Sequence, residues 1–243
     1  MQCVQAYRKV VITSVGHAFE RPYRAISRVG IGVGDAVILV NSFPISQQAW
    51  NTMEELKTRI NEVYFNVFVE EVWLDPRNRF EDNVATLRKI VEKYAPCKVS
   101  ILAVGGFRWL NIALMYLAQV LQSIALIKNI IGISFELELE EDTMSKEVIE
   151  KFFPTQESRV VKILSIPKLV ELSATEIRIL EVISSGKTKV KQILEALKEL
   201  NIEITRPTLQ RKLHQLARKG LVTYVPKGKS YSYSLTPLGK LFT

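Results

Sequence analysis

The chain of 243 residues is long enough for one large domain or two modest ones, and its 47% hydrophobic and 24% charged residues exclude a disordered chain. The net charge of +8 lies in the final third: residues 1–167 carry 19 basic and 19 acidic residues, whereas residues 168–243 carry 14 basic and six acidic ones. Phosphate backbones attract such a basic segment whatever their sequence. We therefore expect the C-terminal part to bind nucleic acid and the neutral N-terminal part to have another task.

Apolar runs and amphipathic stretches alternate along the first two thirds of the chain. The expected strands are Lys9–Ser14, Ala36–Asn41, Phe65–Leu74, Lys98–Val104, Ile131–Leu139 and Arg159–Leu164, and the expected helices are Arg21–Val29, Ser46–Asn61, Glu81–Tyr94, Trp109–Ile127 and Ser145–Phe153. This alternation with short connections predicts an α/β fold with a Rossmann-like, doubly wound, mostly parallel sheet. Within the second helix, the stripe expected to face the core consists of Trp50, Met53, Leu56 and Ile60.

Two stretches admit a second interpretation. Trp109–Ile127 has no charged residue and is long enough to span a membrane, but its polar side chains, such as Asn111 and Gln119, favour a helix buried between the sheet and a second subunit. Gly30–Gly34 superficially resembles a dinucleotide-binding fingerprint, yet it leads into a strand instead of a helix. We interpret it as a turn, and a redox-sensing repressor that binds a nicotinamide cofactor stays a competing hypothesis.

The C-terminal part has the order helix, helix, helix, strand, basic turn, strand. The alternating pattern ends at Ser165–Pro167, so we expect a first domain over residues 1–167 and a second over residues 168–243. Ser173 and Glu176 have the spacing of a capping box, and a second helix follows at Val190–Leu200. A third helix is expected to begin after the N-cap Thr205 and to end at Gly220, before strands Leu221–Val225 and Tyr231–Leu235. This order predicts a winged helix-turn-helix.

In a winged helix-turn-helix, the third helix enters the major groove and the hairpin contacts phosphates or the minor groove. The candidate DNA-binding residues are Lys189, Thr205, Arg206, Thr208, Gln210, Arg211, Gln215, Arg218, Lys227, Lys229 and Tyr231. Two such helices on a dimer would read a pseudo-palindromic site in double-stranded DNA. The alternative is a solvated amphipathic helix beside an ordinary hairpin.

Two loops have the chemistry to bind an anionic ligand. After the first strand come Thr13, Ser14, Gly16, His17 and Phe19, and after the fourth come Gly105, Gly106, Phe107 and Arg108. Ligands of open parallel sheets bind beyond the carboxyl ends of strands, and glycines let main-chain N–H groups approach phosphate oxygens. Arg108 could contact a phosphate, and His17 or Phe107 could stack on a base. Equally, the glycine pair could be a plain tight turn.

The segment Val11–Glu20 and the loop Gly105–Arg108, with a winged helix behind them, resemble the CRISPR-associated Rossmann fold (CARF) regulators. The resemblance is to the archaeal type, in which a CARF domain precedes a winged helix-turn-helix, and it covers nearly the whole chain. The sequence departs from many members in having Ala103-Val104 where an acidic or hydroxyl residue often precedes the glycines. The resemblance implies a homodimer that binds a cyclic oligoadenylate, taken here as cyclic tetra-adenylate, across its two-fold axis with these two loops.

We therefore expect a dimeric, ligand-responsive transcription regulator of a CRISPR-Cas locus in the cytoplasm, without a catalytic residue, cofactor, metal or membrane segment. The alternatives are a ring nuclease, for which Ser14, His17 and Arg108 are the candidate groups, and a repressor that senses another nucleotide. Cys3 and Cys97 lack metal-ligand spacing, which indicates a reducing compartment. Glu136, Glu138, Glu140 and Glu141 are expected on a solvated strand face that runs into a charged loop, and not in a metal site.

Overall fold

The structure is a computed structural model and describes residues 7–139, 145–155, 157–163, 165–227 and 230–243. The strands are β1 (Arg8–Ser14), β2 (Ala36–Ser42), β3 (Phe68–Leu74), β4 (Cys97–Ala103), β5 (Ile130–Glu138), β6 (Val160–Ile163), β7 (Val222–Lys227) and β8 (Ser230–Leu235). The helices are α1 (Glu20–Val29), α2 (Gln47–Val63), α3 (Phe80–Glu92), α4 (Arg108–Ile124), α5 (Lys146–Phe152), α6 (Ala174–Ser184), α7 (Val190–Glu199), α8 (Arg206–Arg218) and α9 (Pro237–Lys240), with a short 3₁₀ turn at Glu157–Arg159.

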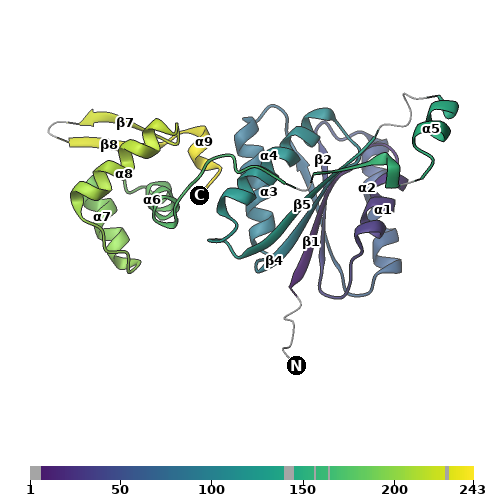
Figure 1. The fold of residues 1–243 in the computed structure, drawn as a ribbon, viewed down its shortest axis with the longest axis horizontal. Coiled ribbons are helices and arrows are strands. Elements are labelled where there is room, and N and C mark those ends of the chain that lie inside the picture. The colour runs from purple at the N-terminus through teal and green to yellow at the C-terminus, as the bar shows by residue number, and fades with distance from the viewer. Residues whose placement is uncertain (1–6, 140–144, 156, 164, 228–229) are drawn as a thin grey trace.

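Six strands form one sheet in the order β3-β2-β1-β4-β5-β6. The first five are parallel to their neighbours and β6 is antiparallel to β5, which confirms the predicted mostly parallel sheet. Helices α1 and α2 cover one face of the sheet, and α3 and α4 cover the other (Figure 1). The strand order reverses between β1 and β4, so the connections leaving these strands diverge, and a crevice opens there.

Side chains from successive positions of β1 enter different cores. Val10 and Ile12 pack with the α3 and α4 side, whereas Val11 packs with the α1 and α2 side. All seven residues of β2 are buried. Strands covered by helices on both faces are near-continuous apolar runs, which explains why these strands were recognisable as buried parallel strands.

Two local predictions are wrong in their detail. Trp50 is exposed, and Ala49 takes its place at the start of the buried stripe of α2, because Ala49 lies four residues before the buried Met53. Strand β3 begins at Phe68 and not at Phe65, since Asn66 has a φ of 54° and turns the chain before the strand.

The C-terminal segment consists of three helices, the antiparallel β7–β8 hairpin and α9 (Figure 1). The capping box of α6 is confirmed: the main-chain N–H of Ser173 donates to Glu176 Oε2 at 2.8 Å, and that of Glu176 donates to Ser173 Oγ at 3.3 Å. Gly220, just past α8, has the predicted left-handed conformation with a φ of 72°. Thr205 occupies the predicted N-cap position of α8, but its side chain does not cap the helix: the hydroxyl lies 2.9 Å from that of Thr208 and bonds no main-chain N–H of α8.

The segment that leads into α6 runs along α4. The main-chain N–H of Leu169 donates to the Gln119 carbonyl at 3.3 Å, and that of Val170 donates to Ser123 Oγ at 3.4 Å. Ser123 in turn donates to the Gln119 carbonyl at 2.9 Å. The second half of α4 therefore fixes the path by which the chain leaves the sheet.

A polar cluster joins the sheet and the C-terminal helices. Arg88 of α3, which is almost fully buried, contacts Glu92 at 2.7 Å and donates to the main-chain oxygen of Thr243. Lys128, just past α4, forms ion pairs with Glu181 of α6 at 2.8 Å and with Glu92 at 3.7 Å. Burial lowers the pKa of Arg88, and Glu92 acts against this. Each charge at this contact therefore lies next to an opposite charge, as partly buried charges require.

We predict that Glu181→Gln destabilises the protein in a pH-dependent way. Burial acts to raise the pKa of Glu181, but hydrogen bonds from Lys128 and Arg178 outweigh it and lower that pKa below its ordinary value. A carboxyl with a lowered folded pKa stabilises the fold above its unfolded pKa, and this contribution is lost as the pH falls through the folded pKa. The variant should lose about 1–2 kcal/mol of unfolding free energy at neutral pH. In urea unfolding, this difference from wild type should shrink towards about pH 3.

The control is Glu195→Gln on α7. Glu195 is exposed and lies 3.9 Å from the exposed Lys191, so its loss should change the unfolding free energy by less than about 0.5 kcal/mol at either pH. A Glu181→Gln effect of the same size at both pH values would contradict the assignment of the shift to this cluster.

Candidate functional site

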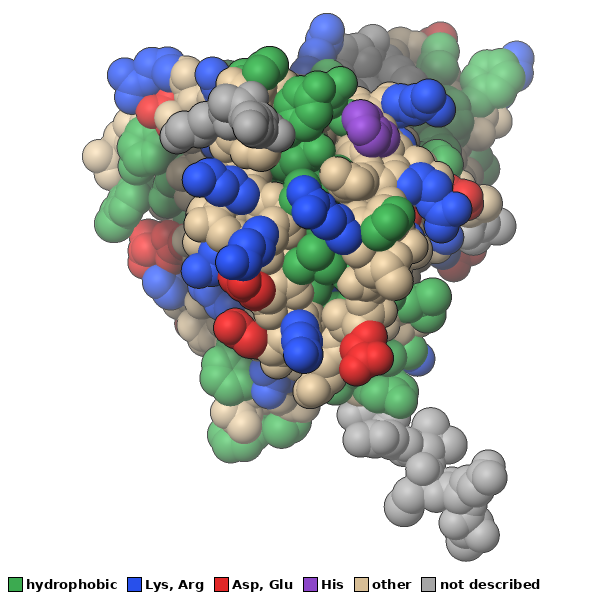
Figure 2. All heavy atoms as spheres, turned by 90° about the vertical axis from the view of Figure 1, so that its left-hand side faces the viewer, with side chains coloured by type: hydrophobic (Ala, Val, Ile, Leu, Met, Phe, Trp, Pro, Cys, Tyr) green, Lys and Arg blue, Asp and Glu red, His purple; other side chains and the backbone are tan. Residues whose placement is uncertain are grey.

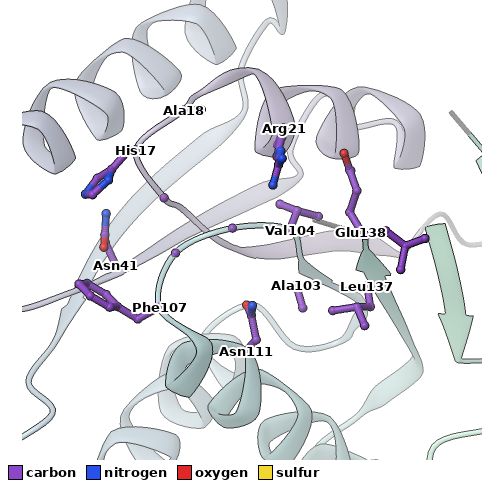
Figure 3. Close-up of a pocket in the computed structure, with 14 residues that line it drawn as sticks. His17, Ala18, Arg21, Asn41, Ala103, Val104, Phe107, Asn111, Leu137 and Glu138 are labelled. Carbon is purple, nitrogen blue, oxygen red and sulfur yellow. The ribbon is translucent and has the colours of Figure 1, made fainter. Parts of the chain in front are cut away.

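A cavity of about 750 Å³ lies at the carboxyl edge of the sheet, where the loops after β1 and β4 meet (Figure 3). Its lining residues are Gly16, His17, Ala18, Arg21, Asn41, Ala103, Val104, Gly105, Gly106, Phe107, Asn111, Leu137, Glu138 and Leu139. They come from the ends of β2, β4 and β5, from both loops and from the first turns of α1 and α4. The cavity therefore lies at the reversal of strand order, the usual ligand position in this class of sheet.

The two glycine loops touch through their main chains. A Cβ atom on Gly16 would lie 2.7 Å from the main-chain nitrogen of Gly106, and one on Gly106 would lie 2.8 Å from the Val15 carbonyl oxygen. Gly106 also has a φ of 73°, which favours glycine. Both positions therefore require glycine, and the close approach brings the main-chain groups of the two loops to one wall of the cavity.

Ser14 supports this contact from beneath. Its fully buried hydroxyl donates to Asn111 Oδ1 at 2.7 Å and accepts from the main-chain N–H groups of Val104 and Gly105, both at 3.3 Å. Thr13 is also fully buried, and its hydroxyl donates to the Ser14 carbonyl at 3.3 Å. One serine thus connects the end of β1, the loop after β4 and the start of α4.

The structure brings together five of the nine residues predicted to bind the ligand. Gly16, His17, Gly105, Gly106 and Phe107 line the cavity. The other four do not: Thr13 and Ser14 are buried below it, Phe19 packs against the core formed with α1 and α2, and Arg108 is exposed at the start of α4.

Sequence reasoning missed the polar side chains that line the cavity from outside the two loops. These are Arg21 on α1, Asn41 at the end of β2, Asn111 on α4 and Glu138 at the end of β5. Figure 3 shows Arg21 extending from the first turn of α1 towards the space between the loops. The position of Asn41 at the carboxyl end of a central strand was the available signal, because side chains at that edge face the crevice of such sheets.

Glu136 and Glu138 do not lie on a solvated face, so that expectation is wrong for them, and Glu140 and Glu141 lie outside the described residues. Glu138, whose side chain is 5% exposed, pairs with Arg24 of α1 at 3.0 Å, and Glu136 pairs with Arg28 at 3.2 Å. These pairs fix α1 to β5, and Glu138 makes one end of the cavity acidic. The anion-attracting groups, Arg21 and the N-terminal turn of α4, come from other walls.

The C-terminal segment carries a second candidate surface on α8. Leu209, Leu213 and Leu216 are buried, as predicted. The exposed candidates are Lys189, Thr205, Arg206, Gln210, Arg211, Gln215, Arg218 and Tyr231, and Thr208 is half-buried. The side chain of Lys227 and the whole of Lys229 lie outside the described residues. Figure 2 views this end of the molecule and shows Lys and Arg side chains predominating over Asp and Glu.

Aromatic contacts hold the hairpin against α8. The Tyr224 ring of β7 lies 6.0 Å from the His214 ring of α8, 5.3 Å from that of Tyr231 and 5.8 Å from that of Tyr233. The main-chain N–H of Tyr233 also donates to the Thr188 carbonyl, just before α7, at 2.8 Å. The hairpin and α8 therefore present one continuous surface.

Other chemistry finds little support in the described part of the chain. No group of three or more His, Cys, Asp or Glu side chains there is arranged to hold a metal ion. None of the helices in those residues is both long and apolar enough to cross a membrane. Burial raises the pKa of the Cys97 thiol to about 11, so little thiolate exists at neutral pH.

The first domain matches a known protein family. Residues 9–148 match the family described as the Csa3 CRISPR-associated Rossmann-like domain. Among solved structures, Enterococcus italicus Csm6 bound to cyclic hexa-2'-fluoro-hexa-dAMP is similar at 12% identity with a TM-score of 0.43, over 87% of this chain and 53% of that one. This chain thus spans about half the length of that structure. No curated protein sequence matches.

We predict that Gly16→Ala destabilises the fold because the new Cβ would collide with the main chain of Gly106. The unfolding free energy should fall by about 1–3 kcal/mol in urea denaturation. The matched control is Gly32→Ala, at an exposed position where the added Cβ would lie 3.9 Å from its nearest neighbour, Asp35 Oδ2. That variant should stay within about 0.5 kcal/mol of wild type. Equal effects of the two substitutions would show that the loops do not need their close approach.

Proposed function

The chain belongs to the family of the Csa3 CRISPR-associated Rossmann-like domain, and from this premise we propose that it is a dimeric, ligand-responsive DNA-binding regulator of a CRISPR-Cas locus. Residues 1–167 would bind a cyclic oligoadenylate and residues 168–243 would bind double-stranded DNA as a winged helix-turn-helix. The observation that carries the proposal is the cavity between the two glycine loops, because its walls offer what a nucleotide needs.

The ligand is an anion with flat bases, and the cavity matches both properties. The glycines expose main-chain groups, and the first turn of α4 has no side-chain cap and no acidic residue, so its N–H groups favour a phosphate. Arg21 takes the role that the sequence had suggested for Arg108, since it is the cation that lines the cavity. The exposed rings of His17 and Phe107 offer faces for stacking.

A second copy of the chain would complete the site. Phe107 is 50% exposed and Ile112, in the second turn of α4, is 57% exposed. Large apolar side chains exposed beside an open cavity are typical of an interaction surface. A two-fold axis at this position would place the same loops of both copies around one ring.

The proposed DNA surface consists of the cations on and beside α8 that do not contact α6. Lys212 and Lys219 contact α6, where Lys219 pairs with Glu176 at 2.7 Å and Lys212 lies 3.4 Å from Ser173 Oγ. Arg206, Arg211 and Arg218 are exposed and have no ion-pair partner among the described residues. Arg211 and Arg218 lie on the helix face opposite the buried leucines, with Arg206 on its flank, and unpaired cations there attract DNA phosphates. In a dimer, two such helices would fit half-sites about 34 Å apart.

Helix α4 would carry the signal between the two sites. It begins beside Phe107 in the cavity, its residues Gln119 and Ser123 bind the segment that leads to α6, and Lys128 just beyond it pairs with Glu181. A ligand shifts the placement of the C-terminal helices only if it binds one arrangement more tightly than the other. Contacts at both ends of one rigid helix provide such a difference.

We predict that one molecule of cyclic tetra-adenylate binds per dimer in a calorimetric titration and is recovered intact. Arg21→Gln should weaken this binding about tenfold or more, because a charge-assisted contact to phosphate is lost. The control is Arg59→Gln, an exposed arginine of α2 that lies away from the cavity and should not change affinity. Recovery of cleaved product would move the assignment to a ring nuclease, and a wild-type protein that binds no ring would contradict the proposal.

We predict that Arg211→Ala weakens binding to an operator selected from random duplexes by about 10–100-fold but changes binding to random DNA little. Binding by the wild type should also fall steeply with salt, because neutralised phosphates release counterions. The control is Lys93→Ala, which replaces an exposed lysine just past α3 and should change neither the affinity for the selected operator nor that for random DNA. Equal losses on selected and random DNA would remove Arg211 from the base-reading surface, and affinity independent of salt would contradict the proposed surface.

A further inference from the structure

Asn41 has a buried side-chain amide whose nitrogen makes no hydrogen bond within the described residues. It closes β2, is 2% exposed and lines the cavity. Its Oδ1 accepts the main-chain N–H of Ser42 at 2.8 Å, which fixes the orientation of the amide. Its Nδ2 has no hydrogen-bond partner among the described residues. The cavity wall therefore contains an oriented hydrogen-bond donor that makes no hydrogen bond within the described protein.

Such an atom is uncommon in this protein. Within the described residues, three buried side-chain atoms lack a hydrogen-bond partner: Asn41 Nδ2, Arg88 Nε and Glu138 Oε2. Two of the three residues line the same cavity. Leaving a buried donor unpaired costs free energy, and such groups concentrate where a ligand supplies the partner.

Other buried or lining asparagines differ from Asn41. Asn83, which is equally buried at the start of α3, donates its Nδ2 to the Asp75 carbonyl at 2.8 Å. Asn111, which also lines the cavity, accepts the Ser14 hydroxyl at 2.7 Å as part of the loop support. Asn83 therefore serves the fold, and Asn111 connects the loops.

The surroundings of Asn41 suit a flat, heteroaromatic ring. Figure 3 shows the Asn41 amide in the view between the rings of His17 and Phe107, at the end of the cavity away from Glu138. Both rings are exposed side chains of the two glycine loops. A base stacked against either ring would direct an edge towards the amide, and movement of these rings would open the route to Nδ2.

We propose that Asn41 is the residue that selects adenine in this cavity, an inference that depends on the proposed function. Its Nδ2 donates to a ring nitrogen of the base, and the second lone pair of Oδ1 accepts the exocyclic amino group. Adenine presents an acceptor nitrogen beside that amino group, the pattern that asparagine matches with two hydrogen bonds. Hypoxanthine has a carbonyl oxygen in place of the amino group and loses this match.

The test compares cyclic tetra-adenylate with cyclic tetra-inosinate by calorimetric titration of the full chain. The wild type should prefer the adenine ring at least about tenfold. Asn41→Leu keeps the branching of the side chain but has no polar atom, so it should bind both rings within about twofold of each other. The control Asn83→Leu removes an equally buried amide outside the cavity and should keep the wild-type preference.

The outcomes separate this inference from the proposed function. A wild type that binds neither ring would overturn both. A wild type that binds both rings equally, or an Asn41→Leu variant that keeps the preference, would overturn the role of Asn41 alone. Titration of the wild type with rings that contain 1-deaza-adenine or 7-deaza-adenine tests the donor without a substitution in the protein. Each analogue lacks one of the two ring nitrogens beside the amino group, so one of the two rings should bind about tenfold more weakly than cyclic tetra-adenylate. If both analogue rings bind as tightly as cyclic tetra-adenylate, the inference is overturned.

Discussion

The close contact of two main-chain loops at the reversal of strand order is the constraint on which the site depends. Gly16 and Gly106 approach so closely that neither can carry a side chain, and the Ser14 hydroxyl fixes both loops and α4 from below. The contact turns the diverging connections of β1 and β4 into one wall lined by main-chain groups. Since every residue except proline carries the same main-chain N–H group, the side chains around this wall determine which ligand is bound. Arg21 and Asn41 reach the same cavity from elements that the two loops do not include.

The cavity has distinct ends, and this polarity follows from the ion pairs of α1. Arg24 and Arg28 pair with Glu138 and Glu136, and Arg21, one turn before Arg24, lines the same cavity. A phosphate placed beside Glu138 would meet a buried carboxylate and is disfavoured there. A ligand whose phosphates lie away from Glu138 fits this distribution of charge best.

The sequence was sufficient for the sheet, because the central strands contain near-continuous apolar runs and are separated by amphipathic helices. It was also sufficient for the glycine loops, since Gly16 and Gly105-Gly106 follow the two central strands. It failed where a side chain's role depends on long-range geometry. Arg108 directly follows the glycines yet is exposed, whereas Arg21 and Asn41 are distant in sequence from the second loop and line the cavity. Glu136 and Glu138 alternate with apolar residues, as on a solvated strand, and only the position of α1 shows that they are paired.

The contact between the first domain and the C-terminal helices combines a continuous apolar core with charged pairs. The charged pairs add directional constraints that apolar packing lacks. Here Lys128 lies between Glu92 of α3 and Glu181 of α6, and Arg88 is buried with its charge compensated by Glu92. Ion pairs of this kind require specific geometry, so a small movement of α4 would exchange partners instead of stretching them evenly. The same helix starts at the loop that lines the cavity and ends four residues before Lys128, which pairs with Glu181 of α6. Under the proposed function, a rigid element between two such contacts would convert a local change in the cavity into a choice between discrete placements of α8.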